Sequence, residues 1–209
     1  MSAAAPTRSD ARRNRDRVVA AALELFASRG IDVSVREIAS AAGVGLATVY
    51  RHFPTRDDLV DAALVEAFAE CIAIAEDALE AESAWEGLTS FFEGTLGLHA
   101  GNRGFIDVVE TQERGRERSK AMRARMRSLL AKLIARAQAE GTLRPDFTPQ
   151  DATLVFWACD RTIELVGGVA PDAWRRQLSF ILDGLRAERV TAVDVPSLTA
   201  RQLAQAGLA

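Results

Sequence analysis

The side chains best suited to bind another molecule near the N-terminus are Thr48, Tyr50, Arg51 and His52. A hydroxyl, a phenol, a guanidinium and an imidazole can all donate hydrogen bonds to phosphate oxygens, and arginine also pairs with guanine. If this stretch is helical, these four side chains and Ala47 lie on its outward face. Their chemistry predicts a surface that contacts a nucleic-acid groove, although a solvated outer face explains Arg51 equally well.

The flanking sequence predicts the elements that position this surface. Ser34 and Glu37 have the spacing of a capping box, so a short helix is expected at about 35–42. Gly43 and Gly45 then allow a tight turn, a second short helix follows at 46–52, and Pro54 ends it. A longer amphipathic helix is expected before them, at about 12–29. Two short helices joined by such a turn have the layout of a helix-turn-helix, here over residues 35–53.

The charge distribution supports this placement. The net charge of the 209 residues is −3, but the chain through residue 56 carries nine basic and five acidic side chains, a net of +4. The remaining 17 basic and 24 acidic residues give −7. Binding to a polyanion is a property of a domain, so the N-terminal quarter is the candidate. A later basic segment, 114–136, has apolar residues at helical spacing and is interpreted as a core helix with a charged outer face.

Several short motifs in this quarter occur together in a fixed order. They are Phe26, Gly30, Val35-Arg-Glu-Ile-Ala39, Ala42-Gly43-Val44, Thr48-Val-Tyr-Arg-His-Phe53, Arg56 and Leu59. Together they resemble the DNA-binding domain of the TetR family of bacterial transcription regulators, over about residues 12–65. The resemblance implies an all-α homodimer with an N-terminal three-helix DNA-binding domain and a fourth helix leading to a larger effector domain. It also implies repression that a small molecule usually relieves.

The resemblance assigns roles residue by residue. Arg36 and Thr48 correspond to positions at or near the bases, and Tyr50, His52 and Arg56 to phosphate contacts. Arg56 stands where the family commonly has lysine and keeps the charge. Ala47 lies at a variable position, where its methyl suits contact with thymine. The basic stretch before the first helix, in residues 1–11, is expected to be a flexible arm that is either a solvated tail or a minor-groove reader.

Beyond residue 55 the pattern stays helical, and no strand is expected. Helices are predicted at about 55–82, 83–99, 117–140, 148–166 and 171–189, with a helix or irregular segment near 105–113 and an Ala-rich tail at 191–209. We expect residues 66–190 to form the ligand-binding and dimerisation domain. The last two long helices are expected to pair with their symmetry mates, because one hairpin is too small to bury their apolar side chains. These side chains are Trp157, Val166, Trp174, Leu178, Ile181, Leu182 and Leu185.

The same region contains a candidate effector pocket, because such pockets combine apolar walls with a few polar anchors. The apolar candidates are Phe92, Leu96, Phe105, Val108, Val109, Met122, Met126 and Trp157, and the polar ones are His99, Arg103, Glu110 and Gln112. Each of them can equally well fill an ordinary core.

Other functional classes lack their signatures. The chain has two histidines and two cysteines, so a histidine-rich metal site or a thiolate cage is not expected, and no P-loop, HExxH motif or nucleophile elbow occurs. No cofactor is expected. No apolar run is long enough for a membrane helix, no signal peptide precedes the arginines, and the expected compartment is the cytoplasm. Two alternatives remain: a helical protein-interaction module, or a small-molecule enzyme, whose helix-turn-helix no longer binds DNA.

Overall fold

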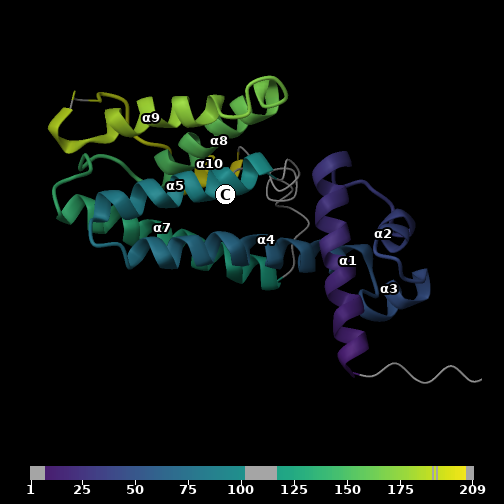
Figure 1. Cartoon of the computed structure of the whole chain (residues 1–209). Helices are drawn as coiled ribbons and strands as arrows, with labels where there is room; N and C mark the ends of the chain where they lie inside the picture. Colours follow the sequence, from purple (N-terminus) through teal and green to yellow (C-terminus); the bar gives the residue numbers. More distant parts are fainter. Residues whose placement is uncertain (1–7, 102–116, 190, 192, 206–209) are drawn as a thin grey trace, which may run out of the picture. The chain divides into compact units, whose positions relative to one another are not determined.

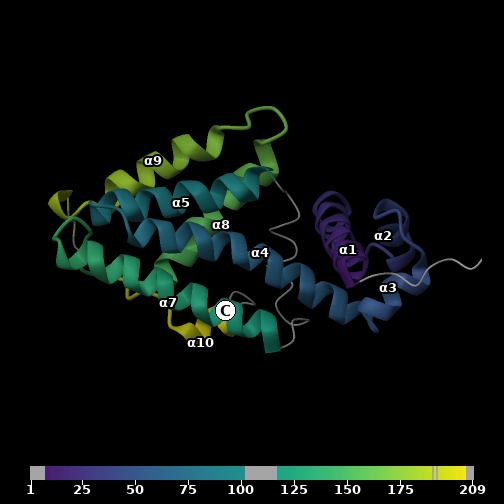
Figure 2. The same cartoon turned by 60° about the horizontal axis from the view of Figure 1, so that its bottom comes forward.

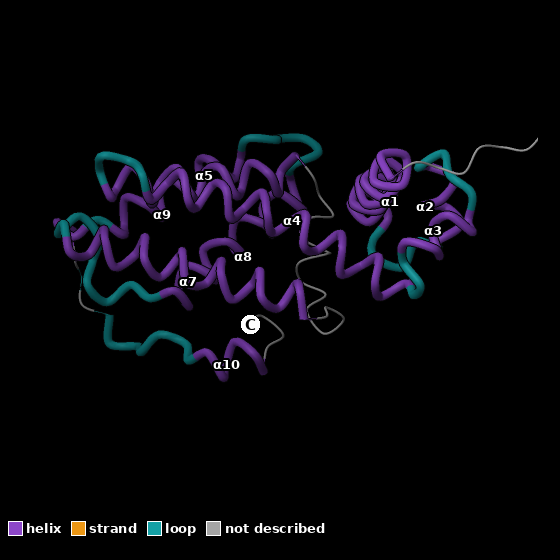
Figure 3. Tube along the Cα trace, turned by 90° about the horizontal axis from the view of Figure 1, so that it is seen from below, coloured by secondary structure: helices purple, strands orange, loops and turns teal. Residues whose placement is uncertain are grey.

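The computed structural model describes residues 8–101, 117–189, 191 and 193–205 of the chain. This part of the chain folds into helices and loops, and its only β-type pairing is an isolated bridge between Leu143 and Arg186 (Figure 3). It divides into two compact units. Unit 1 contains residues 8–67 and 117–120, and unit 2 contains residues 68–101 and the rest of the chain from residue 121. The all-α class expected from the sequence is confirmed.

Unit 1 contains helices α1 (Arg8–Arg29), α2 (Val35–Ala41), α3 (Leu46–His52) and the first half of α4 (Arg56–Leu79) (Figure 1). Its core is built from one face of each of the first three helices: Val18, Ala22 and Phe26 of α1, Ile38 and Ala39 of α2, and Val49 of α3 are all at most 3% exposed. Phe53, directly after α3, closes this core. Burial of these apolar faces is the main force that fixes the short helices, which are too short to be stable alone.

The first helix begins earlier than the sequence pattern indicates. α1 starts at Arg8 rather than at about residue 12, so residues 8–11 of the expected flexible arm are helical. Asp10 contacts Arg13 at i, i+3, and Asp16 lies 4.0 Å from Arg12 at i, i+4. Such pairs extend a helix into a polar stretch in which the apolar periodicity is absent. Residues 1–7 of the arm lie outside the described residues.

Unit 2 contains the second half of α4, then α5 (Ala84–Gly101), α7 (Glu117–Ala139) from residue 121 onward, α8 (Pro149–Val166), α9 (Ala173–Leu185), a 3-10 turn at Ala187–Arg189 and α10 (Ala200–Gln205). Figures 1 and 2 show α5, α8 and α9 side by side, and these three helices contact one another. α8 begins at the predicted capping box, in which Thr148 accepts from the Asp151 amide and Asp151 accepts from the Thr148 amide. The segment expected near 105–113 lies outside the described residues.

The apolar side chains of α9 have a different role from the one expected. Trp174 and Leu178 are 1% exposed, Leu182 is 7% and Leu185 is 8% exposed, and all four belong to the core of unit 2. The expectation that they face a partner chain does not fit this burial, because α9 uses this stripe to pack against α5 and α8 of the same chain. Val166 and Ile181 are partly buried. The apolar side chains that α8, α9 and their connection expose are instead Leu154, Trp157, Leu165, Val169 and Phe180.

Candidate functional site

The turn between α2 and α3 is fixed by backbone geometry and capping. Ser34 and Glu37 form the predicted capping box at the start of α2. Gly43 has a φ of +62°, a left-handed conformation that favours glycine, and the amide of Val44 donates to the carbonyl of Ala39 at 3.0 Å. Gly45 is the N-cap of α3. These local contacts set the angle between the two short helices.

α3 turns one side chain inward and several outward. Val49 is fully buried, whereas Ala47, Arg51 and Tyr50 are exposed, with Tyr50 at 47%. Thr48 is half-buried on the same helix, and Arg36 is exposed on α2. The helix-turn-helix therefore presents a hydroxyl, a phenol and two guanidinium groups on its surface, as the sequence predicts.

Two of the side chains predicted to contact phosphate, those of Arg56 and His52, are less accessible than expected. The guanidinium of Arg56 donates to the carbonyl of Ile31 and lies 3.9 Å from Asp32, and its side chain is 30% exposed. It therefore clamps the loop between α1 and α2. Nε2 of His52 is buried without a hydrogen-bond partner, so this atom cannot reach a phosphate unless the ring turns.

α1 contributes two arginines to the helix-turn-helix that the sequence pattern did not place there. The Cζ atom of Arg15 lies 5.6 Å from the centre of the Phe53 ring, and Arg17 donates to the carbonyl of Gly43 at 3.5 Å. Each contact joins residues at least 26 positions apart, so no local pattern could reveal it. Part of the positive charge is balanced within α1, because Arg15 also lies 3.8 Å from Asp16.

In unit 2, some of the expected pocket residues do lie together. Phe92 and Leu96 are fully buried and His99 is 7% exposed, all on α5, and Met122 and Met126 of α7 pack against the same core. Arg103, Phe105, Val108, Val109, Glu110 and Gln112 lie outside the described residues. The expectation that Trp157 lines the pocket is wrong, because its side chain is 45% exposed and does not face this interior. Its neighbour Phe156 does, with ring centres 4.9 Å from Phe92 and 6.1 Å from His99.

The polar partner of His99 is a residue that the sequence did not connect with it. Nδ1 of His99 lies 2.7 Å from Oδ1 of Asp160 on α8, and both side chains are about nine-tenths buried. Asp160 stands between Phe156 and Ile163 on the inward stripe of its helix, and an acidic residue on an apolar stripe was the available signal. Thr95, one turn before His99, has a buried hydroxyl oxygen with no partner. Aromatic side chains next to a few buried polar groups are the combination that ligand-binding sites use.

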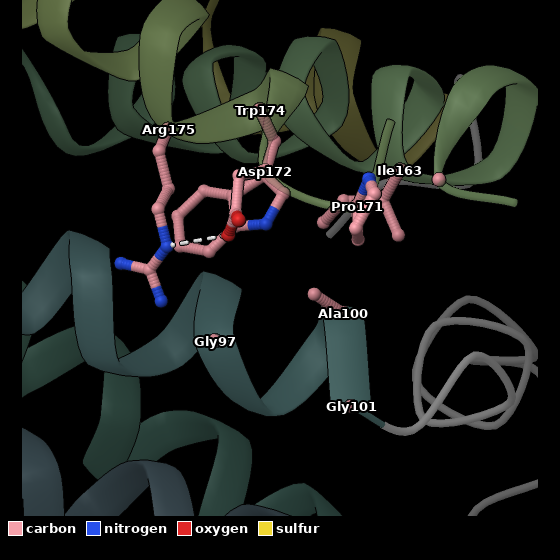
Figure 4. Close-up of a pocket in the computed structure, with 9 residues that line it drawn as sticks. Gly97, Ala100, Gly101, Ile163, Pro171, Asp172, Trp174 and Arg175 are labelled. Atoms are coloured by element: carbon pink, nitrogen blue, oxygen red, sulfur yellow. Dashed lines mark hydrogen bonds and ion pairs between the residues drawn. The ribbon is translucent and has the colours of Figure 1, made fainter. Parts of the chain in front are cut away.

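A pocket of about 240 Å³ opens at the ends of α5 and α8. Figure 4 shows its α5 wall, made of Gly97, Ala100 and Gly101, opposite Ile163, Pro171 and the side chains of Asp172, Trp174 and Arg175. Gly167 also lines it. No sequence pattern predicts the pocket, because the small residues of its α5 wall have no chemical signature and its other wall comes from residues at least 62 positions away in the sequence.

The described residues contain neither a cluster suited to a metal ion nor a helix suited to cross a membrane. Within the described part of the chain, no group of three or more His, Cys, Asp or Glu side chains is placed to hold a metal ion. In the same residues, no helix combines the length and the apolar character needed to cross a bilayer.

Known protein families match both parts of the chain. Residues 18–63 match the family described as bacterial regulatory proteins, tetR family. Residues 83–187 match the C-terminal domain described as transcriptional regulator SbtR-like. The two matched segments contain the helix-turn-helix and most of unit 2.

Solved structures and curated proteins give the same assignment. A TetR transcription regulatory protein from Mycobacterium vanbaalenii is 31% identical, with a TM-score of 0.61, over 86% of this chain and 98% of that one. The TetR regulator SCO0520 from Streptomyces coelicolor is 29% identical, with a TM-score of 0.61, over 82% and 98%. An HTH-type transcriptional regulator of Staphylococcus aureus strain USA300 is 42% identical over 53 residues, which is 25% of this chain and 29% of that regulator. One family domain spans half of this chain, and a solved relative that is 31% identical aligns over 98% of the relative's own length. This chain therefore belongs to the TetR family of DNA-binding transcriptional regulators.

Proposed function

We propose that this regulator is a homodimeric repressor that a small molecule releases from a palindromic operator. The observation that carries the proposal is the exposed apolar set on α8, α9 and their connection, in which Leu165, Val169 and Phe180 are 63%, 88% and 61% exposed. Large apolar side chains gathered on adjacent elements mark an interaction surface. A second copy covers them in a symmetric interface, in which the same patch serves both protomers.

The dimer gives the helix-turn-helix its geometry on DNA. Two copies of α3 reach successive major grooves when they lie about 34–36 Å apart. In this arrangement Arg36 and Thr48 contact bases, Ala47 contacts a thymine methyl, and Tyr50 and Arg51 contact bases or phosphates. His52 and Arg56 contribute phosphate contacts after their side chains rearrange. The functional boundaries are residues 12–65 for DNA binding and 66–190 for effector binding and dimerisation.

In this proposal the effector binds at the aromatic cluster of unit 2. Phe92, Leu96 and Phe156 supply apolar walls, and the His99–Asp160 pair and the Thr95 hydroxyl supply polar anchors. A ligand that binds one spacing of the two α3 helices better than the other weakens DNA binding by the difference, typically about 1–3 kcal/mol. In this role the buried histidine and carboxylate bind a ligand and catalyse no reaction, and the protein acts in the cytoplasm, where its DNA target lies.

Binding to a library of genomic fragments tests the proposal. The full-length protein is incubated with the library at two salt concentrations, and the bound fragments are sequenced. Enrichment of one palindromic site that Tyr50→Ala abolishes supports the proposal, as does a dimer in light scattering. Weak, sequence-independent retention that salt removes would overturn it in favour of simple basic-patch adhesion. A monomer at micromolar concentration would overturn the dimer.

A further inference from the structure

The pocket at the ends of α5 and α8 holds a guanidinium that contacts both an indole ring and a carboxylate. Nε of Arg175 lies 3.2 Å from Oδ1 of Asp172, and Cζ of Arg175 lies 4.4 Å from the centre of the Trp174 ring. Figure 4 shows the three side chains together on the α9 side of the pocket. A planar cation over an aromatic face, paired with a carboxylate, is a favourable way to bind an organic cation.

The three side chains differ greatly in how firmly they are held. The Trp174 side chain is buried in the core of unit 2, whereas the side chains of Arg175 and Asp172 are 54% and 80% exposed. An exposed ion pair contributes little stability, so breaking the Arg175–Asp172 pair costs little. An incoming cation replaces the stacking contact that Arg175 makes with Trp174. Asp172 is the N-cap residue of α9 but makes no side-chain capping bond. Its carboxylate is therefore available for a different cation.

The rest of the pocket suits a small, flat and largely apolar body. Gly97, Ala100 and Gly101 bring the surface of α5 close without bulky side chains, and Ile163 and Pro171 add apolar walls. The volume of about 240 Å³ lies below the range of about 300–1,000 Å³ that is usual for ligand pockets, so the pocket suits a small ligand. Gly167, the C-cap of α8, lies at the pocket and places the negative end of that helix there.

We propose that this pocket binds a small aromatic cation with a planar amidinium or guanidinium head, whose place Arg175 takes in the free protein. The cation stacks on Trp174 and pairs with Asp172 after Arg175 swings outward. The site is separate from the aromatic cluster around His99. Ligand binding at this pocket is measured without DNA, so the test does not depend on the proposed repressor function. An anion held by Arg175 is the competing possibility, and it predicts the opposite effect of removing Arg175.

Benzamidine is a suitable probe because its amidinium resembles the head of arginine and its ring fills the apolar part. The full-length protein is labelled with ¹⁵N, and the indole N–H signals of Trp85, Trp157 and Trp174 are followed by NMR during titration. The Trp85→Phe and Trp157→Phe variants assign the signals. We expect a saturable shift of the Trp174 signal only. The neutral isostere benzamide and the anion benzoate are expected to bind at least about tenfold more weakly.

Three variants decide between the two possibilities. Arg175→Ala removes the competing cation and is expected to strengthen benzamidine binding by about three- to tenfold. Asp172→Asn is expected to weaken it by about fivefold or more. Arg176→Ala is the matched control, because Arg176 stacks over Phe180 at 4.9 Å and does not line the pocket, so the affinity stays unchanged. Loss of binding in Arg175→Ala, stronger binding of benzoate, or no shift of Trp174 at millimolar benzamidine overturns the proposal.

Discussion

Nδ1 of His99 on α5 lies 2.7 Å from Oδ1 of Asp160 on α8, inside an otherwise aromatic and aliphatic core. The two residues are 61 positions apart, and each helix supplies one member of the pair. The bond therefore joins two of the helices that form unit 2. Because both side chains are about nine-tenths buried, neither can exchange its partner for water without opening the core.

Removing both members of this pair is expected to cost less than the sum of the costs of removing each one alone. His99→Leu or Asp160→Leu leaves a buried polar partner behind, so each should lower the free energy of unfolding by about 2–4 kcal/mol. The double variant leaves no such group and should lose less than the sum of the two. Chemical denaturation of the four proteins measures the coupling. Strictly additive losses would show that the two side chains do not act as a pair.

Arg56 and Tyr50 should separate stability from DNA affinity. Arg56→Ala removes the hydrogen bond to the Ile31 carbonyl and should lower the free energy of unfolding by about 1–2 kcal/mol. Tyr50→Ala removes an exposed side chain and should leave stability within about 0.5 kcal/mol while reducing operator affinity. Thermal unfolding and operator binding are measured on the same preparations. A Tyr50→Ala protein that unfolds early would assign Tyr50 a structural role instead.

A side chain at Gly43 should destabilise the turn between α2 and α3. Gly43→Ala forces a left-handed φ on alanine and places its Cβ 2.6 Å from the Arg17 guanidinium, so a loss of about 1–2 kcal/mol is expected. Adding Arg17→Ala removes the close contact but keeps the backbone strain. The double variant should therefore recover part of the loss, as measured by denaturant unfolding. Full recovery would mean that the contact with Arg17, and not φ, is the cause.

The helix-turn-helix could be predicted because each of its signals is local. The Ser34–Glu37 capping box and the left-handed glycine at position 43 act within a few residues, and the sequence displays both. Arg56 differs because its hydrogen bond reaches 25 positions back to the Ile31 carbonyl. Such a contact depends on how α4 packs, which no periodicity records.

In unit 2 the sequence indicated which residues are apolar but not which neighbours would bury them. Phe156 and Trp157 are adjacent on α8, and either fits a helical stripe; packing against Phe92 selects Phe156 and exposes Trp157. The amphipathic pattern of α9 predicts contact with a partner chain, whereas in the structure α5 and α8 of the same chain pack against this stripe. An amphipathic helix shows that a partner exists and does not identify it.

The two cysteines should be unreactive in the native protein. Burial raises the pKa of the Cys71 thiol to about 12, with smaller contributions from Glu70 and Asp160, and burial raises that of Cys159 to about 11. Only the thiolate is nucleophilic, so labelling with a disulfide reagent at pH 8 should be slow until denaturant is added. Rapid labelling of native Cys71 would contradict its burial.

The same two thiols make stability depend on alkaline pH. Because the folded pKa of Cys71 lies above its ordinary value of 9.0, the folded state holds the proton more tightly than the unfolded state. This contribution is fully present below pH 9 and is lost as the pH rises toward 12. Denaturation at a series of pH values should show a shallower alkaline decline for Cys71→Ala than for the unchanged protein. Parallel declines would assign the alkaline loss to other groups.

Leu178 and Phe180 lie two residues apart on α9 and should affect different states of the protein. Leu178 is 1% exposed and packed in the core, so Leu178→Ala should lower the free energy of unfolding by about 2–5 kcal/mol. Phe180 is 61% exposed, so Phe180→Asp should leave the fold of the protomer intact but place a charge in the proposed interface of each subunit. Light scattering should then show a shift toward monomer at concentrations where the unchanged protein is dimeric. Ser179 is also exposed on α9, so Ser179→Asp is the control for the effect of an added charge alone. The opposite result would be a dimer that survives Phe180→Asp but dissociates, without unfolding, in Leu178→Ala. It would mean that the dimer interface uses the face of α9 that contains Leu178 and not the face that contains Phe180.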